Sequence, residues 1–112
     1  MSEYLYLFRG GVDSQTDLSP DKMQAHLQKW TDWMDTLIKQ GKMAGGKRLG
    51  SEGKVAKNQS IVTDGPFAEG KEIVAGYMLI NAKDLAEAVT ISQGCPILQV
   101  GGTVEIRETI QQ

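Results

Sequence analysis

The sequence lacks most of the features that would place it in a specialised class of proteins. It holds one cysteine, Cys95, so an internal disulfide is excluded, and neither this cysteine nor the one histidine forms a metal site alone. No apolar run approaches the roughly 18 residues that span a bilayer. The start of the chain has neither the basic segment nor the long apolar segment of a secretory signal. We therefore expect a cytoplasmic protein without membrane contact, metal ion or cofactor.

The chain also lacks a strong charge of either sign. Its 112 residues carry a formal charge of −2, which argues against nucleic acid as a partner. Half of the twelve cations nevertheless fall within residues 39–57: Lys39, Lys42, Lys47, Arg48, Lys54 and Lys57. One interpretation is a patch for an anionic ligand or nucleic acid. We favour the other, a solvated edge hairpin whose lysines discourage the addition of another strand.

The composition is that of one globular domain, which we place at residues 1–112. Apolar residues make up 40% of the chain, enough for a hydrophobic core. Strands are expected at residues 3–9, 61–63, 72–80 and 103–110, and residues 42–60 predict a twisted strand followed by a hairpin.

Two helices are predicted between these strands. The run Ser19-Pro20-Asp21 is typical of a helix start, and a helix of about 20 residues should end before Gly41. Its expected apolar stripe consists of Met23, Leu27, Trp30, Met34, Leu37 and Ile38. Asn81 is the expected cap of the second helix, which ends at Gly94. One side of that helix holds Leu85, Ala88, Val89 and Ser92.

This order of elements predicts a ferredoxin-like α+β fold, βαββαβ, with a hairpin inserted before the third main strand. The first and third main strands would be central in such a sheet, and both are apolar on two faces. Two helices cover only one face of a sheet. We therefore expect a second copy of the chain to cover the other, giving a homodimer.

Four single residues are candidates for chemistry or binding outside any motif. His26 lies beside the apolar stripe, where it would act as an acid or base near neutral pH or simply shield a tryptophan. Trp33, at the margin of the stripe, is a ligand or interface candidate. Arg9 ends a central strand, where its guanidinium would anchor a carboxylate. Cys95 is interpreted as a small structural residue.

The densest group of ionisable side chains lies in residues 62–72, with the sequence VTDGPFAEGKE. Asp64 and Gly65 alone are typical of a turn. A hairpin, however, requires neither Phe67 nor so many charges. The candidate ligand-binding residues of the whole chain are therefore Arg9, Trp33, Phe67, Glu69, Lys71 and Glu72.

Residues 62–72 resemble the signature of the DGPF family, named for the motif found here as Asp64-Gly65-Pro66-Phe67, within the wider YCII-related group. The similarity extends to YLYLFRGG, GGKRLG and VEIRE, with Gly70 where relatives usually have a small polar residue. The resemblance implies a dimeric α+β barrel, a bacterial cytoplasmic protein and a link to extracytoplasmic-function sigma factors. It implies no settled reaction, and no motif matches His26 to the histidine proposed to act in relatives.

Two functions remain open from the sequence. The first is a homodimeric module that binds a small ligand or a regulatory partner, in which Asp64 and Glu69 order the turn and Lys71 and Glu72 form solvated ion pairs. The alternative is a cofactor-independent enzyme of the isomerase, cyclase or lyase type. Asp64 would then act as acid or base, and His26 as an acid if it reaches the same cleft.

Overall fold

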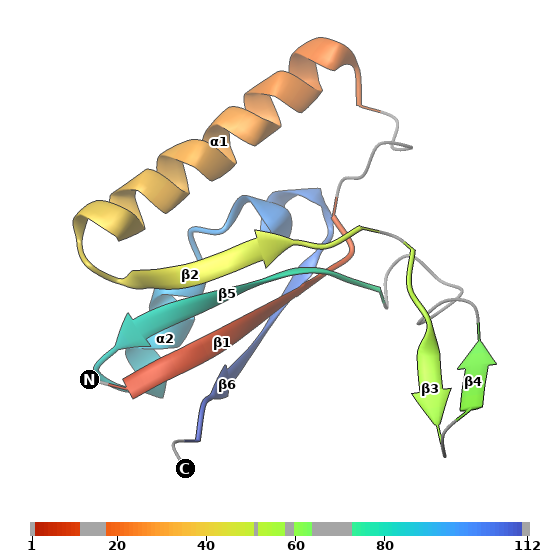
Figure 1. Ribbon diagram of the computed structural model, residues 1–112. Coiled ribbons are helices and arrows are strands. Elements are labelled where there is room, and N and C mark those ends of the chain that lie inside the picture. The colour runs from red at the N-terminus through yellow and green to blue at the C-terminus, as the bar shows by residue number, and fades with distance from the viewer. Residues whose placement is uncertain (1, 12–17, 51, 58–59, 64–72, 111–112) are drawn as a thin grey trace.

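The computed structural model describes residues 2–11, 18–50, 52–57, 60–63 and 73–110 of the chain. Its centre is a four-stranded antiparallel sheet with the strand order β2-β5-β1-β6 (Figure 1). The strands of this sheet are β1 (Ser2–Arg9), β2 (Met43–Arg48), β5 (Val74–Ala82) and β6 (Thr103–Glu108). The helices are α1 (Pro20–Lys39), α2 (Leu85–Ser92) and the 3₁₀ helix η2 (Pro96–Val100).

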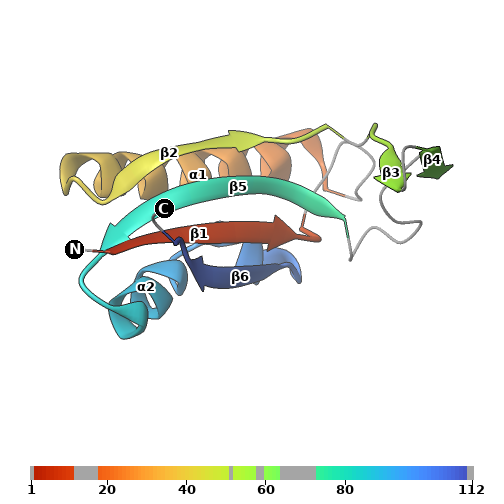
Figure 2. The same ribbon diagram turned by 60° about the horizontal axis from the view of Figure 1, so that its bottom comes forward.

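This topology confirms the predicted ferredoxin-like α+β fold, with the first and third main strands, β1 and β5, in the centre of the sheet. Both α-helices lie on the same side of the sheet (Figure 2). The molecule is only 18 Å thick in its shortest dimension, which is the thickness of one sheet and one helix layer. The predicted hairpin is present as β3 (Val55–Lys57) and β4 (Ser60–Thr63), which form a separate two-stranded sheet beyond the end of the main one (Figure 1).

Helix α1 begins and ends where the sequence predicts, and Trp30, Met34 and Leu37 of the predicted stripe pack on the core, but two other members of the stripe do not. The Lys22 N–H donates to Ser19 Oγ at 3.3 Å, which is the expected N-cap bond. His26 and Leu37 are buried, whereas Leu27 and Ile38 are 46% and 57% exposed. The prediction that Leu27 and Ile38 belong to the buried stripe is therefore wrong. Only one narrow side of the helix meets β1, β2 and η2, and that side includes the histidine.

Helix α2 is also turned relative to its prediction. Strand β5 continues through Asn81, and Asp84 caps the helix instead, accepting from the Glu87 N–H at 2.9 Å. The small residues Ala88 and Ser92 face the core, whereas Leu85 and Val89 are 53% and 39% exposed. The reason is the close approach of this helix to the sheet, where the Tyr6 hydroxyl donates to the Ala88 carbonyl oxygen. Larger side chains would not fit in this layer.

The core fills the space between the sheet and the helices. Tyr4, Tyr6 and Phe8 alternate along β1 and point into it, as side chains do on one face of a strand. Strand β5 contributes Met78 and Ile80 to the same layer. The helices cover this face of the sheet.

The opposite side of the sheet, which we call the open face, is apolar and has no described element on it. Its apolar side chains are Leu5, Leu7, Leu49, Ala75, Tyr77 and Leu79. Leu5 pairs with Leu79 and Leu7 with Tyr77 across β1 and β5. Leu49 continues β2, because its N–H donates to the Ala75 carbonyl at 2.9 Å, and its side chain is 45% exposed. Both faces of the central strands are thus apolar, as predicted, and one of them is uncovered among the described residues.

The pairing of β2 with β5 depends on Gly46, and this dependence is testable. A Cβ at Gly46 would lie 2.6 Å from the Tyr77 carbonyl oxygen, whereas a Cβ at Gly45 meets nothing within 4 Å. Both glycines have positive φ, of 157° and 152°, so alanine is strained at either. We expect Gly46→Ala to lower the free energy of unfolding by about 2 kcal/mol more than Gly45→Ala, measured by chemical denaturation. Equal losses would contradict this register.

Candidate functional site

The most distinctive group of side chains joins α1 to β1, and we call it the His26 cluster: Phe8, His26, Trp30 and Trp33. The Trp30 ring stands edge-on to Phe8 with ring centroids 5.3 Å apart, and to Trp33 with centroids 5.7 Å apart. Its indole Nε1–H donates to His26 Nε2 at 3.1 Å. His26 is only 8% exposed, so this hydrogen bond lies at the boundary of the core.

The environment of His26 favours its neutral form. Burial lowers the pKa of His26 below its usual value of 6.5, and the nearby ammonium of Lys29 lowers it further. Because Nε2 accepts the indole proton of Trp30, the neutral imidazole carries its own proton on Nδ1. The nitrogen that a catalytic base would use is therefore engaged within the protein. This arrangement supports a structural role for His26, as the acceptor for a partly buried indole.

Trp33 is positioned by the turn that follows α2. A Cβ at Gly94 would lie only 3.0 Å from Trp33 Nε1, so the glycine leaves the room that the indole occupies. Trp33 is partly buried against the core, and it touches Trp30 edge-on. Its predicted role in ligand binding stays a prediction.

Cys95 and Tyr6 are chemically inert in the core. Cys95 is 1% exposed, and burial raises the pKa of its thiol to about 12. A thiol with so high a pKa is not a nucleophile at physiological pH, which confirms the structural interpretation. Burial and the neighbouring Cys95 raise the pKa of the Tyr6 hydroxyl as well, so it stays protonated as the donor to Ala88.

Arg9 lies on the open face, on the other side of the sheet from His26. It follows Leu5 and Leu7 in the alternation of β1, and its guanidinium forms an ion pair with Glu105 of β6. The structure therefore does not bring Arg9 and His26 together in one chain. Because the sheet separates them, a single cleft of one chain holding both residues is not formed.

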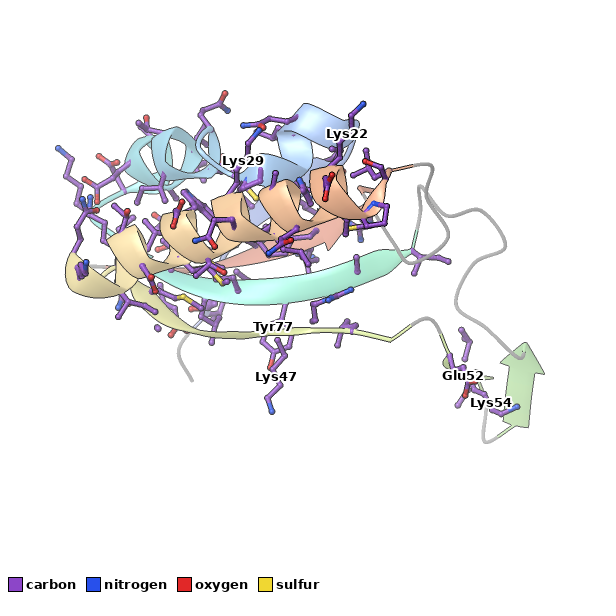
Figure 3. All side chains as sticks on the ribbon, turned by 90° about the horizontal axis from the view of Figure 1, so that it is seen from above. Lys22, Lys29, Lys47, Glu52, Lys54 and Tyr77 are labelled. Atoms are coloured by element: carbon purple, nitrogen blue, oxygen red, sulfur yellow. The ribbon has the colours of Figure 1, made fainter. Side chains whose placement is uncertain are left out.

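The remaining predicted site residues lie outside the described residues: Asp64, Phe67, Glu69, Lys71 and Glu72. Their roles stay predictions. The cations in the described part of the chain are spread over several elements. Figure 3 shows Lys22 and Lys29 on α1, Lys47 beside Tyr77 on the main sheet, and Lys54 near the hairpin. Within the described segments, no helix has the length and apolar character needed to cross a membrane.

Sequence reasoning did not identify the bond between Trp30 and His26, although the signal was present. Residues four apart on a helix are neighbours on its surface, so a histidine and a tryptophan at this spacing meet. The helix η2 was also missed, because no further helix was predicted between Gly94 and the last strand. Lys29 Nζ donates to Gln99 Oε1 of this 3₁₀ helix at 3.1 Å, which links α1 to it.

The element order and strand order define a small protein with the ferredoxin-like α+β fold. The chain matches the YCII-related domain over residues 4–111 and belongs to that family. It is similar in structure to 5-chloro-2-hydroxyhydroquinone dehydrochlorinase (TftG) from Burkholderia phenoliruptrix AC1100, solved in complex with 2,5-dihydroxybenzoquinone. That likeness has a TM-score of 0.53 and 14% sequence identity, and it covers 98% of this chain and 95% of the other. A search of curated proteins finds no match.

The interpretation of His26 as an acceptor can be tested with a double-mutant cycle. His26→Ala leaves the Trp30 N–H without its partner, which costs about 1–3 kcal/mol of unfolding free energy for a buried donor. In a Trp30→Phe background no donor exists, so the same substitution should cost about 1 kcal/mol less. His26→Gln supplies another acceptor and should recover part of the loss. Equal costs in both backgrounds, measured by denaturation at pH 7.5, would refute the interpretation.

Proposed function

We propose that this YCII-related protein is a homodimeric module that binds a small molecule, with two copies packed through their open faces. The observation that carries the dimer is the apolar character of that face, on which Leu5, Leu7, Tyr77 and Leu79 lie along the two central strands. A contiguous apolar surface of this kind on a soluble protein is typical of an interface. With a shortest dimension of 18 Å, the described residues form one sheet and one helix layer and no third layer on the open face.

The charges around the open face suit a second copy better than an unrelated partner. Strands β1 and β6 place two acidic and two basic residues on this side of the sheet: Glu3, Arg9, Glu105 and Arg107. In a dimer with twofold symmetry the same patch meets itself, so a surface that carries both signs is able to complement its own copy. A partner whose surface carries charges of mainly one sign would not complement a face that carries both signs.

The dimer is tested by a charge placed at the centre of the open face. Leu7→Lys should convert a dimer of about twice the 12.2 kDa chain mass into a monomer, because each copy would bury a lysine in the apolar interface. The measurement is light scattering at several concentrations. Leu27→Lys, at a position that is 46% exposed on the helix side, is the control and should leave the dimer intact. A monomeric wild-type protein at micromolar concentration would contradict the proposal.

The ligand part of the proposal rests on the density of ionisable groups in the sequence of residues 62–72 and on the family. TftG, with the same fold, was solved with 2,5-dihydroxybenzoquinone, a small ring compound that carries two hydroxyl groups. Asp64 and Lys71 offer an acceptor and a cation of the kind that such a compound would engage. A cytoplasmic setting and a link to sigma factors, which the resemblance implies, belong to the same proposal.

A second candidate function is a cofactor-independent enzyme with Asp64 as the acid or base. It is favoured by the likeness to TftG, which is a dehydrochlorinase. The engagement of His26 Nε2 with Trp30 argues against the simplest form of this mechanism, in which His26 donates or takes the second proton. The enzyme would then depend on Asp64 without a histidine partner from α1.

Two measurements with 2,5-dihydroxybenzoquinone as the probe distinguish the two candidate functions: calorimetry for binding and absorbance for turnover. We expect wild-type protein to bind the compound and Asp64→Asn to bind it about tenfold more weakly, since a hydrogen bond to a charged group is lost. Asp35→Asn, on the exposed side of α1, is the control and should bind normally. Binding without turnover supports the module, and turnover that Asp64→Asn abolishes supports the enzyme. No binding by the wild type contradicts this class of ligand.

A further inference from the structure

Helix α1 is attached to the rest of the chain by two connections of different chemistry. At its C-terminal end the connection is made by the backbone: the Lys42 N–H donates to Leu37 O at 2.8 Å, and the Asn81 N–H donates to Lys42 O at 2.7 Å. These bonds do not titrate. The N-terminal half is attached through side chains, where Trp30 packs edge-on against Phe8 of β1 at 5.3 Å. The orientation of that indole is set by its hydrogen bond to His26.

Protonation of His26 is incompatible with this hydrogen bond. The imidazolium carries a proton on both ring nitrogens, so a second N–H at Nε2 would point at the indole N–H of Trp30. The two donors repel each other at 3.1 Å, and the imidazole has to turn away into solvent. Trp30 then loses the acceptor that holds its ring against Phe8, and its partly buried N–H is left without this partner.

The charged groups around His26 in the described part of the chain offer no compensation for a positive charge. On α1 itself the neighbours one turn away are Lys22 and Lys29, both basic. The side of β1 that faces the helix carries Tyr4, Tyr6 and Phe8, which are not anionic. Helix η2 holds no ionisable side chain, and the adjacent Cys95 stays a neutral thiol. No carboxylate among these residues would stabilise the imidazolium.

We propose that the bond between His26 and Trp30 is a pH-sensitive lock on the N-terminal half of α1. At pH values above the titration of His26, the neutral imidazole holds the Trp30 indole against Phe8, and the whole helix lies on the sheet. At pH values below the titration of His26, the N-terminal half of α1 separates from β1 and η2. The C-terminal end stays attached to β2 and β5 through its backbone hydrogen bonds. Gly41, with a φ of 71°, follows the fixed end of the helix.

The sign of the pH dependence follows from linkage. Because the locked form binds the proton less well than the open form, the locked form is fully stable above the ordinary histidine pKa of 6.5. It loses stability as the pH falls from that value toward the lower pKa of the locked form. The opposite trend, with the lock strengthening on acidification, is not possible for a buried acceptor of this kind.

The lock can be tested in the wild-type protein, because His26 is the only histidine of the chain. In untagged protein labelled with ¹⁵N-histidine, NMR should show one imidazole in the Nδ1–H tautomer with a titration midpoint below 6.5. The Trp30 indole N–H resonance, assigned with Trp30→Phe, should shift with the same midpoint. The Nε2–H tautomer, a midpoint at or above 6.5, or an indole resonance that does not follow the titration would each overturn the proposal.

Amide hydrogen exchange at pH 7.5 and pH 5.0, corrected for the effect of pH on the intrinsic exchange rate, then tests whether the N-terminal half of α1 separates from the sheet. We expect protection to fall in residues 22–33 of α1 and to remain in residues 34–39. His26→Gln keeps an acceptor that does not titrate, so its protection pattern should be the same at both values of pH. Loss of protection over the whole chain, or the same acid response in His26→Gln, would refute the lock. Neither result depends on the dimer or on ligand binding.

Discussion

Strand β1 imposes the constraint on which the rest of the structure depends. It is central in the sheet and carries large apolar side chains on both faces, with Tyr6 and Phe8 toward the helices and Leu5 and Leu7 on the other side. Burial of apolar area contributes about 25 cal/mol per Å², so each face of such a strand stabilises the fold only to the extent that it is covered. Two helices cover one face. The apolar open face is the reason why the proposed function begins with a second copy of the chain.

A hydrogen bond joins helix α2 directly to the central strand β1. The Tyr6 hydroxyl donates to the carbonyl oxygen of Ala88, and the small side chains of α2 face inward as a result. On α1, His26 lies at the boundary of the core and accepts from Trp30 of the same helix. In both places a buried polar group has a hydrogen-bond partner. Leu27 and Leu85 lie on the exposed sides of these helices.

The parts of the fold that were predicted correctly depend on local signals. Ser19 caps α1 through its own side chain, and the alternation along β1 places successive residues on opposite faces whatever lies above them. The cap of α2 was predicted three residues too early, because Asn81 and Asp84 are both good caps and only the length of β5 decides between them. The sheet lies between Arg9 and His26, so these two candidate residues do not share a cleft within one chain. Asp64 and its neighbours lie outside the described residues, so their arrangement stays a prediction.

The sequence by itself determined the order of the elements, the family and the two apolar faces of the central strands. These properties depend on residue types at fixed spacings and on no distant contact. Only the tertiary structure decided which side of each helix is buried, which partner His26 has and on which face Arg9 lies. A helix with apolar residues on more than one side has several orientations of similar energy. The choice among them depends on contacts between residues far apart in the chain, such as Tyr6 with Ala88 and Phe8 with Trp30.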